Sequence, residues 1–202
     1  MLPPDVLDTL AGIAPGSPLD LLRRRKPVTR ENAQASFLAL FAPADPGGVS
    51  VLERAAVAAF VAGIHDDPAA RDFYGAMLSA AGAPAPLGAA IVREVAGAAG
   101  SGPYGSFPAG PLSREDAPGR LFSVAPGSRA ILGDRIAAAL DHAHMLVFHP
   151  RDATPAALRK LEAAGWSATD IVTLSQLVSF LCFQLRAACG LRALGASLRS
   201  PS

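Results

Sequence analysis

The segment from Gly48 to Gly82 constrains the fold most, because it holds the start signals of two consecutive helices. Ser50 and Glu53 have the spacing of a capping box, in which each side chain accepts a hydrogen bond from the other residue's backbone N–H. Residues 55–64, which follow, are almost wholly apolar. The first helix should therefore be buried on most sides.

A short acidic corner, His-Asp-Asp-Pro at residues 65–68, follows the first helix. Asp67 can cap the next helix, and Pro68 suits its first position, where no backbone N–H is needed. Gly82 is a natural stop for this second helix. The segment thus predicts two helices that meet at a corner.

The composition is apolar and nearly neutral. Of the 202 residues, 50% are hydrophobic and 17% are charged, the mean hydropathy is +0.31, and the net charge is +1. This charge gives no electrostatic case for nucleic acid or an anionic membrane as a partner. The basic run at residues 23–26 is typical of a solvated helix end. The high hydropathy leads us to expect buried subunit interfaces, and hence a homo-oligomer.

Two features lead us to expect a soluble, cytoplasmic protein. The N-terminus, MLPPDVLDTL, has prolines and acids where a secretory signal needs a basic stretch and an apolar stretch. The longest uncharged run, residues 73–92, is interrupted by Gly82, Pro84 and Pro86, unlike a single membrane-spanning helix.

The two cysteines, Cys182 and Cys189, are expected on one helix. At the usual rise per residue their Cα atoms would be about 10 Å apart. A disulfide needs less than about 7 Å. We therefore expect two unbridged cysteines that behave as small buried hydrophobic residues.

Turn signals divide the chain into four regions, namely an N-terminal helical segment (1–47), a first helical half with the corner (48–97), a Gly/Pro-rich arm (98–127) and a second helical half (128–202). Helices are expected near residues 5–13, 17–26, 29–41, 50–64, 68–82, 87–97, 128–148, 154–163 and 167–188. No segment shows convincing period-two alternation, so the class is all-α. Tyr104, Phe107 and Phe122 could anchor the arm against a neighbouring molecule.

The two halves begin alike. The pattern Gly48-Val-Ser50-x-x-Glu53 is matched by Gly165-Trp-Ser167-x-x-Asp170, and each precedes a long apolar helix. This match suggests two related helical halves joined by the arm.

The helix start Leu52-Glu53-Arg54 with its corner, and the segment from Ala164 to Arg186, resemble the alkylhydroperoxidase-D and carboxymuconolactone-decarboxylase superfamily, in particular its peroxidase-related members with two halves. The resemblance covers most of residues 48–194. It implies an alkylhydroperoxidase-D-like all-α bundle built from two related halves, a homo-oligomer, and peroxidase or decarboxylase activity.

Peroxidases of that superfamily carry Glu, eleven residues, Cys-x-x-Cys, three residues and His. The thiols lie at a helix N-terminus, where their pKa is lowered, and Glu and His relay protons. Counted from Glu53, the cysteine and histidine positions hold His65, Pro68 and Asp72. Counted from Arg54 and Gly82, they hold Asp67, Ala70 and Tyr74, and the Glu position holds Ala55. No thiol lies at the corner, so disulfide-cycling chemistry there is not expected.

The catalytic candidates lie around the corner. Glu53 could be a general base, with a capping role as the simpler alternative. His65 and Asp67 could relay protons, with a helix-capping role for Asp67 as the simpler alternative. Tyr74 could donate its hydroxyl to a bound anion or carbonyl, or could simply pack at a rim.

The candidates for substrate binding are Gln176, Gln184, His149 and Arg151. The two glutamines interrupt an apolar helix, where bonding across a subunit interface is the alternative. Arg151 could contact an anion, and a cationic His149 would complement a helix end. Because His142, His144 and His149 lack the i, i+4 spacing of a helical zinc pair, no metal site is expected.

Three functions remain open. The first is a thiol-free enzyme that performs acid–base chemistry on, or binds, a small acid, lactone or peroxide, and for which no cofactor is expected. The second is a non-catalytic assembly or binding subunit of a redox system, which could pair with a cysteine-bearing paralogue. The third is a peroxidase that uses Cys182 or Cys189, disfavoured because apolar surroundings raise a thiol's pKa.

Overall fold

The computed structural model describes residues 2–198, which form nine α-helices and two short 3-10 helices. No strand occurs in this part of the chain, where extended backbone pairs only at one isolated bridge between Gly105 and Ala117. The predicted all-α class is therefore confirmed.

The chain begins with three helices, α1 (Val6–Ala11), α2 (Pro18–Arg24) and α3 (Pro27–Phe41). Asp5 and Ser17 cap the first two through their side chains. The third was predicted near residues 29–41 and begins two residues earlier, at Pro27, whose fixed φ suits the first helical position.

Ion pairs fix these helices to one another. Arg23 pairs with Asp5 and Asp8, and its side chain is only 9% exposed. The prediction that the basic run is a solvated helix end is therefore wrong for Arg23, since carboxylates on α1 and at its start neutralise the guanidinium.

Asp20 is the centre of the neighbouring ion pairs. Hydrogen bonds from Arg24, from the backbone N–H of Gly16 and from Arg30 hold the pKa of its carboxyl well below the usual range. The N-terminal segment thus depends on an ionised aspartate that is nearly inaccessible to solvent.

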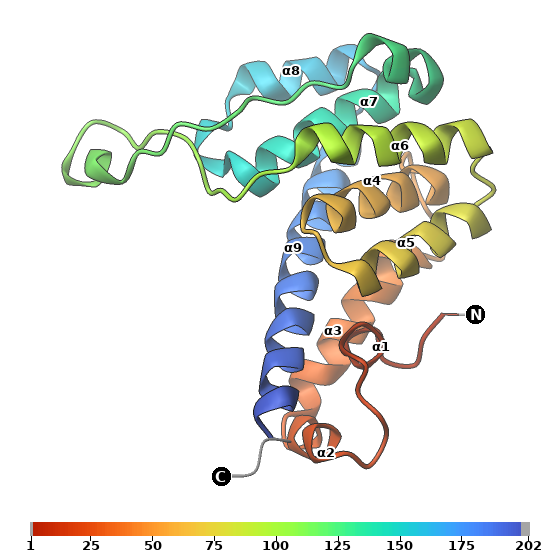
Figure 1. Ribbon diagram of the computed structural model, residues 1–202. Coiled ribbons are helices and arrows are strands. Elements are labelled where there is room, and N and C mark those ends of the chain that lie inside the picture. The colour runs from red at the N-terminus through yellow and green to blue at the C-terminus, as the bar shows by residue number, and fades with distance from the viewer. Residues whose placement is uncertain (1, 199–202) are drawn as a thin grey trace.

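α4 (Val51–Ile64) is the central helix, and it contacts α3, α5 (Pro68–Ala80), α6 (Ala85–Ala98), α7 and α9. The segment predicted to be buried on most sides is so, with ten of the fourteen residues of α4 buried. Figure 1 shows α4 between the other helices, with α5 on one side and α6 on the other.

The second half comprises α7 (Pro126–Phe148), the 3-10 turn η2 (Pro150–Asp152), α8 (Pro155–Ala163) and α9 (Ala168–Ser197). Gly133, with φ 75°, kinks α7 near its start, where a side chain would be strained. α9 extends nine residues beyond its predicted end and runs down beside α1, α2 and α3.

α9 is long and apolar enough, by these two criteria alone, to cross a membrane. The core helix of a soluble protein meets the same criteria, and 44% of its most apolar window is buried within the chain.

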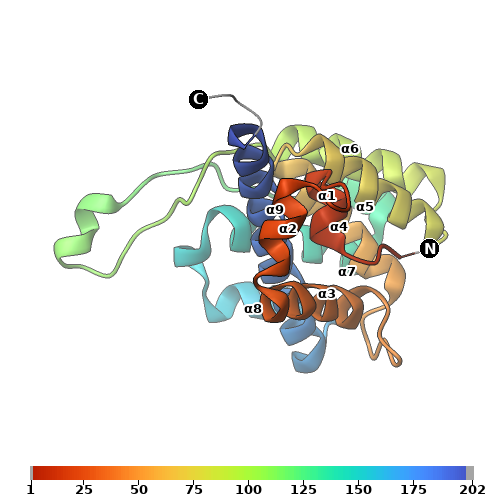
Figure 2. The ribbon, with the colours of Figure 1, turned by 90° about the horizontal axis from the view of Figure 1, so that it is seen from below.

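The predicted arm is present, as residues 99–125 between α6 and α7, with the short 3-10 helix η1 (Pro111–Glu115) at its tip. In both ribbon views it extends beyond all helices (Figures 1 and 2). The three aromatic residues expected to anchor it, Tyr104, Phe107 and Phe122, contact Phe148, Arg151 and Phe60 of their own chain.

The two capping boxes recognised in the sequence, at Ser50–Glu53 and Ser167–Asp170, are both formed. Arg135 of α7 joins them: its Nε lies 2.5 Å from Glu53 Oε1 and its Nη2 3.4 Å from Asp170 Oδ2. The indole of Trp166 stacks on the same guanidinium at 4.3 Å. The N-termini of α4 and α9 are thereby held side by side.

Candidate functional site

The structure does not bring the four predicted catalytic residues into one site. Glu53 caps α4 at its start and pairs with Arg135. His65 lies at the other end of the same helix, about 18 Å away at the usual helical rise. A proton relay between these two side chains is therefore not possible in this arrangement.

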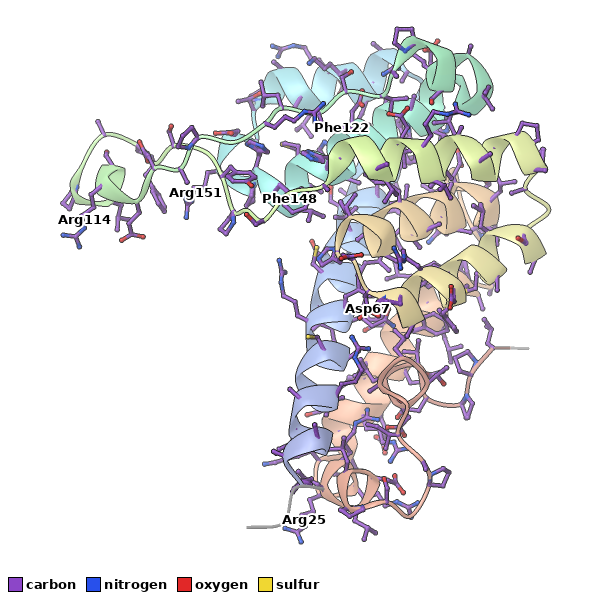
Figure 3. The ribbon with its side chains drawn as sticks, viewed as in Figure 1. Arg25, Asp67, Arg114, Phe122, Phe148 and Arg151 are labelled. Carbon is purple, nitrogen blue, oxygen red and sulfur yellow. The ribbon has the colours of Figure 1, made fainter. Side chains whose placement is uncertain are left out.

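Asp67 links three helices at the corner. It caps α5 by accepting from the N–H of Ala70 at 3.1 Å, and it forms an ion pair with Arg192 of α9. Arg192 also donates to the carbonyl of Leu10 in α1 at 2.8 Å. Figure 3 shows Asp67 directed toward α9, so its carboxylate is used in packing the corner.

His65 has one satisfied and one unsatisfied nitrogen. Its Nδ1 lies 2.9 Å from the carbonyl of Val61, and its buried Nε2 has no partner among the described residues. Burial lowers the pKa of this imidazole, so it is held in the neutral form.

Tyr74 and Gln184 form a fully buried pair. The Tyr74 hydroxyl donates to Gln184 Oε1, while Gln184 Nε2 has no partner in the part of the chain that the structure describes. Burial raises the pKa of Tyr74, so the phenol stays protonated. The rings of Phe41 and Phe73 pack around it. Tyr74 therefore does not lie at a rim, and Gln184 bonds within its own chain rather than across a subunit interface.

The other predicted binding residues are dispersed. Gln176 is exposed on α9. Arg151 stacks on the ring of Phe107 at 4.0 Å and donates to the carbonyl of Glu115, so it supports the arm (Figure 3). His149 is buried at the base of the arm, where both ring nitrogens contact oxygen atoms.

An open apolar groove of about 760 Å³ lies near the corner, between α4, α5 and α6. It reaches Asp66 and Arg71 but borders none of the predicted catalytic residues. Since both of these charged residues are exposed, the groove offers no buried titratable group for chemistry.

A second cleft, of about 700 Å³, lies between α7, α8 and the returning limb of the arm. Its apolar walls include Leu121, Phe122, Met145 and Leu161. Its charged and titratable groups are Arg129, Asp134, Asp141, His142 and Lys160. A mixed lining of this kind, with a few convergent polar groups, is typical of small-molecule sites.

Helical spacing places the key residues of this cleft. Positions 138, 141, 142 and 145 follow the i, i+3, i+4, i+7 pattern of one helix face on α7. α8 begins at Pro155 behind its cap Thr154, and turns Lys160 and Leu161 toward that face.

Asp141 connects the arm to α7. Its Oδ1 accepts from the backbone N–H of Val124 at 2.7 Å, and its Oδ2 accepts from Arg129 at 2.8 Å. Burial nevertheless raises the pKa of this carboxyl, because it outweighs both bonds and the charges of Arg129 and Lys160. A carboxyl with a raised pKa at a cleft is a candidate general acid or base.

His142 borders the same cleft and is 6% exposed. Within residues 2–198, neither of its ring nitrogens has a hydrogen-bond partner. Burial lowers the pKa of the imidazole, so it is neutral at pH 7 and keeps one donor and one acceptor. Buried polar atoms normally have partners, so these nitrogens are available to a ligand.

A smaller cavity of about 210 Å³ continues the cleft toward the base of the arm. It shares Phe122, Asp141 and Lys160 with the larger one and reaches His144 and His149. The His144 ring stacks on Phe122 at 4.8 Å, and burial lowers the pKa of His144 to about 4. No group of three or more metal-ligating side chains occurs in the described part of the chain.

No role for this cleft was predicted from the sequence. By helical pattern alone Asp141 and His142 fall among the polar positions of their helix, but His142 is buried because the arm and α8 cover that face. One sequence feature could have identified these residues. It is an adjacent Asp-His pair that is followed by an apolar stretch and lies shortly after an arm long enough to fold back over it.

Comparisons with known proteins found no family model, no curated protein and no solved structure that matches the chain.

Proposed function

We propose that the protein binds a small organic molecule in the cleft between α7, α8 and the arm, and performs acid–base chemistry on it without a thiol. The observation that carries this proposal is the adjacent pair Asp141 and His142 at the cleft, of which Asp141 is half-buried and His142 buried. The pKa of the carboxyl is raised and that of the imidazole is lowered. The raised pKa favours the protonated carboxyl of Asp141, which can donate a proton to a bound ligand. The lowered pKa favours the neutral imidazole of His142, which can accept one.

The proposed ligand is a small acid, lactone or peroxide, the class expected from the sequence. Lys160 borders both cavities and forms no salt bridge with the described residues, so its ammonium can receive a carboxylate. The resemblance to the alkylhydroperoxidase-D superfamily, supported by the helix–corner–helix of α4 and α5, remains part of the proposal.

A thiol mechanism receives no support from the geometry. Cys182 and Cys189 are both free, and neither borders the cleft. The expectation that both are buried is wrong, because Cys182 is half-buried and Cys189 is exposed. Burial raises the pKa of the Cys182 thiol, although Arg186 beside it acts in the opposite direction. A higher thiol pKa leaves less of the nucleophilic thiolate.

The test is a titration with benzoate, followed by the backbone amide signals in NMR. Benzoate should shift signals of residues 138–145 and 157–161 in a saturable way, with an affinity in the millimolar range typical of fragments. His142→Phe should weaken binding at least about fivefold, since it removes both ring nitrogens. The matched control, His65→Phe, should leave binding unchanged. Shifts centred on the corner, or none at all, would contradict the proposal.

A second candidate is an assembly subunit, as a homo-oligomer or with a cysteine-bearing paralogue. The arm favours it, because it projects from the helices and exposes Leu112, while α9 exposes Val172 and Phe183. Sedimentation velocity of wild type and of a Phe183→Ser variant tests this candidate. A concentration-dependent oligomer that the variant weakens would support it, and a monomer at high micromolar concentration would exclude self-assembly.

A further inference from the structure

The base of the arm is fastened at His149, whose two ring nitrogens both contact oxygen atoms. Nδ1 lies 3.0 Å from Oδ2 of Asp152, and Nε2 lies 3.0 Å from the carbonyl oxygen of Arg120. The imidazole is buried, with His149 2% exposed. Water is therefore poorly placed to replace either contact.

These two contacts require a particular protonation state. A carbonyl oxygen and a carboxylate can only accept hydrogen bonds, whereas a neutral imidazole has one donor and one acceptor. With Asp152 ionised, both bonds form together only when His149 carries protons on both nitrogens. Loss of one proton turns one contact from a charge-assisted bond into an unfavourable approach of two acceptors.

The same residues hold both limbs of the arm. Asp152 Oδ1 accepts from the N–H of Ser106 on the outgoing limb, at 3.4 Å. His149 donates to Arg120 on the returning limb, and the next residues, Leu121 and Phe122, form the wall of the cleft. A change at His149 is thus transmitted directly to that wall.

Other titratable groups face His149 from each neighbouring element. Arg120 comes from the arm, as does Tyr104, whose ring is 5.2 Å away and whose hydroxyl is bonded to Ser101. From α7, His144 lies 6.0 Å away, with a pKa that burial lowers to about 4.

Asp141 and Lys160 border the same cavity as His149, on the faces of α7 and α8. Asp141 is engaged with Val124 and Arg129, and Lys160 contributes an ammonium group from α8. Histidine is the side chain whose charge normally changes between about pH 5 and 8, and the neighbouring His144 is neutral in this range. His149 is the histidine at the arm's base whose two ring nitrogens both hold contacts of the arm, so these contacts depend on its protonation state.

We propose that His149 and Asp152 form a proton-operated latch that closes the arm over the cleft when His149 is doubly protonated and frees it when His149 is neutral. This regulation rests on the proposed function of the cleft. The latch itself can be tested without any ligand.

The test is hydrogen exchange of the full chain, measured by mass spectrometry at pH 5.5 and pH 8.0 and corrected for the intrinsic rate. In wild type, amides of residues 104–121 should open about five- to tenfold more at pH 8.0, the loss expected for one hydrogen bond. The core helix α4 should show no such change. Equal opening of the arm at both pH values would overturn the proposal.

Asp152→Asn separates the latch from simple destabilisation. The Asn side-chain N–H can donate to Nδ1 of a neutral His149, while Nε2–H still donates to Arg120 and the Asn oxygen still accepts from Ser106. The variant should therefore keep the arm protected at pH 8.0 and remove the pH dependence. Faster exchange of the arm at both pH values would show that Asp152 has only a structural role, and would overturn the latch.

The benzoate titration at the two pH values keeps the two proposals apart. Faster benzoate association at pH 8.0 in wild type, but not in Asp152→Asn, would support control of the cleft by the latch. Benzoate binding with pH-independent arm exchange would overturn the latch and leave the cleft as the site. If hydrogen exchange of the arm depends on pH but benzoate does not bind, the result would support the latch and count against the proposed function of the cleft.

Discussion

The pair Tyr74–Gln184 allows a decisive test of whether the corner is structural or functional. Both side chains are fully buried, and Gln184 already has one unpartnered nitrogen. Tyr74→Phe would leave the amide oxygen unpartnered as well. Because an unsatisfied buried polar group costs about 1–3 kcal/mol, we expect a loss near 2 kcal/mol in the free energy of unfolding.

The matched change on the other side is Gln184→Met, which leaves the Tyr74 hydroxyl without an acceptor and should also cost about 1–3 kcal/mol. The double variant replaces both partners by apolar groups of similar shape, so its cost should be close to zero. The two changes should therefore be strongly non-additive, with a coupling of about 2 kcal/mol or more, as found for residues in direct contact.

Urea unfolding followed by circular dichroism measures these effects. With a slope of about 2 kcal/mol per molar urea, a loss of 2 kcal/mol lowers the midpoint by about 1 M. Tyr104→Phe is the control, since that tyrosine is only partly buried and should change stability by about 0.5 kcal/mol at most. Additive single and double variants would refute the reasoning. A Tyr74→Phe variant of normal stability that loses ligand binding would place function at the corner.

Three further predictions concern the framework. Arg135→Met should lower the free energy of unfolding, measured by chemical denaturation, by about 2–4 kcal/mol, because it leaves two carboxylates without their cation. The control Arg71→Met, on the surface, should lower it by about 0.5 kcal/mol at most. Gly48→Ala should lower the melting temperature, because its Cβ would lie 2.2 Å from an Asp170 oxygen. Arginine and backbone partners lower the pKa of Asp20. The stabilisation of the folded chain by the ionised carboxylate is therefore complete above about pH 4 and should be lost as the pH falls further. Hydrogen exchange of residues 18–24 measures this loss.

Helix starts were predicted well from the sequence where a side chain caps its own helix. Ser50, Asp67 and Ser167 cap α4, α5 and α9 as expected. A capping bond joins residues only three positions apart, so the local sequence contains all the atoms involved. The helices α3, α6 and α7 have no capping side chain, and each begins two residues before its predicted start, with a proline in its first turn.

The roles of the candidate site residues could not be predicted in the same way. Glu53, Asp67 and Tyr74 each bond to a residue far along the chain, at separations of 82, 125 and 110 positions. The sequence around a carboxylate or a phenol does not show which distant residue will form an ion pair or a hydrogen bond with it. The relation between the two halves remains a prediction, although both begin with the same capping box.

The sequence alone determined the helical class, the caps and the arm, because these follow from hydrogen bonds and apolar spacing within a few residues. Only the tertiary structure decided which polar groups are buried and which have partners. His142 shows the difference: its helical position was evident, but the cleft beside it exists because α8 and the returning arm cover that face of α7. Burial and pairing depend on segments that are distant in the chain, and they decide where the candidate chemistry lies.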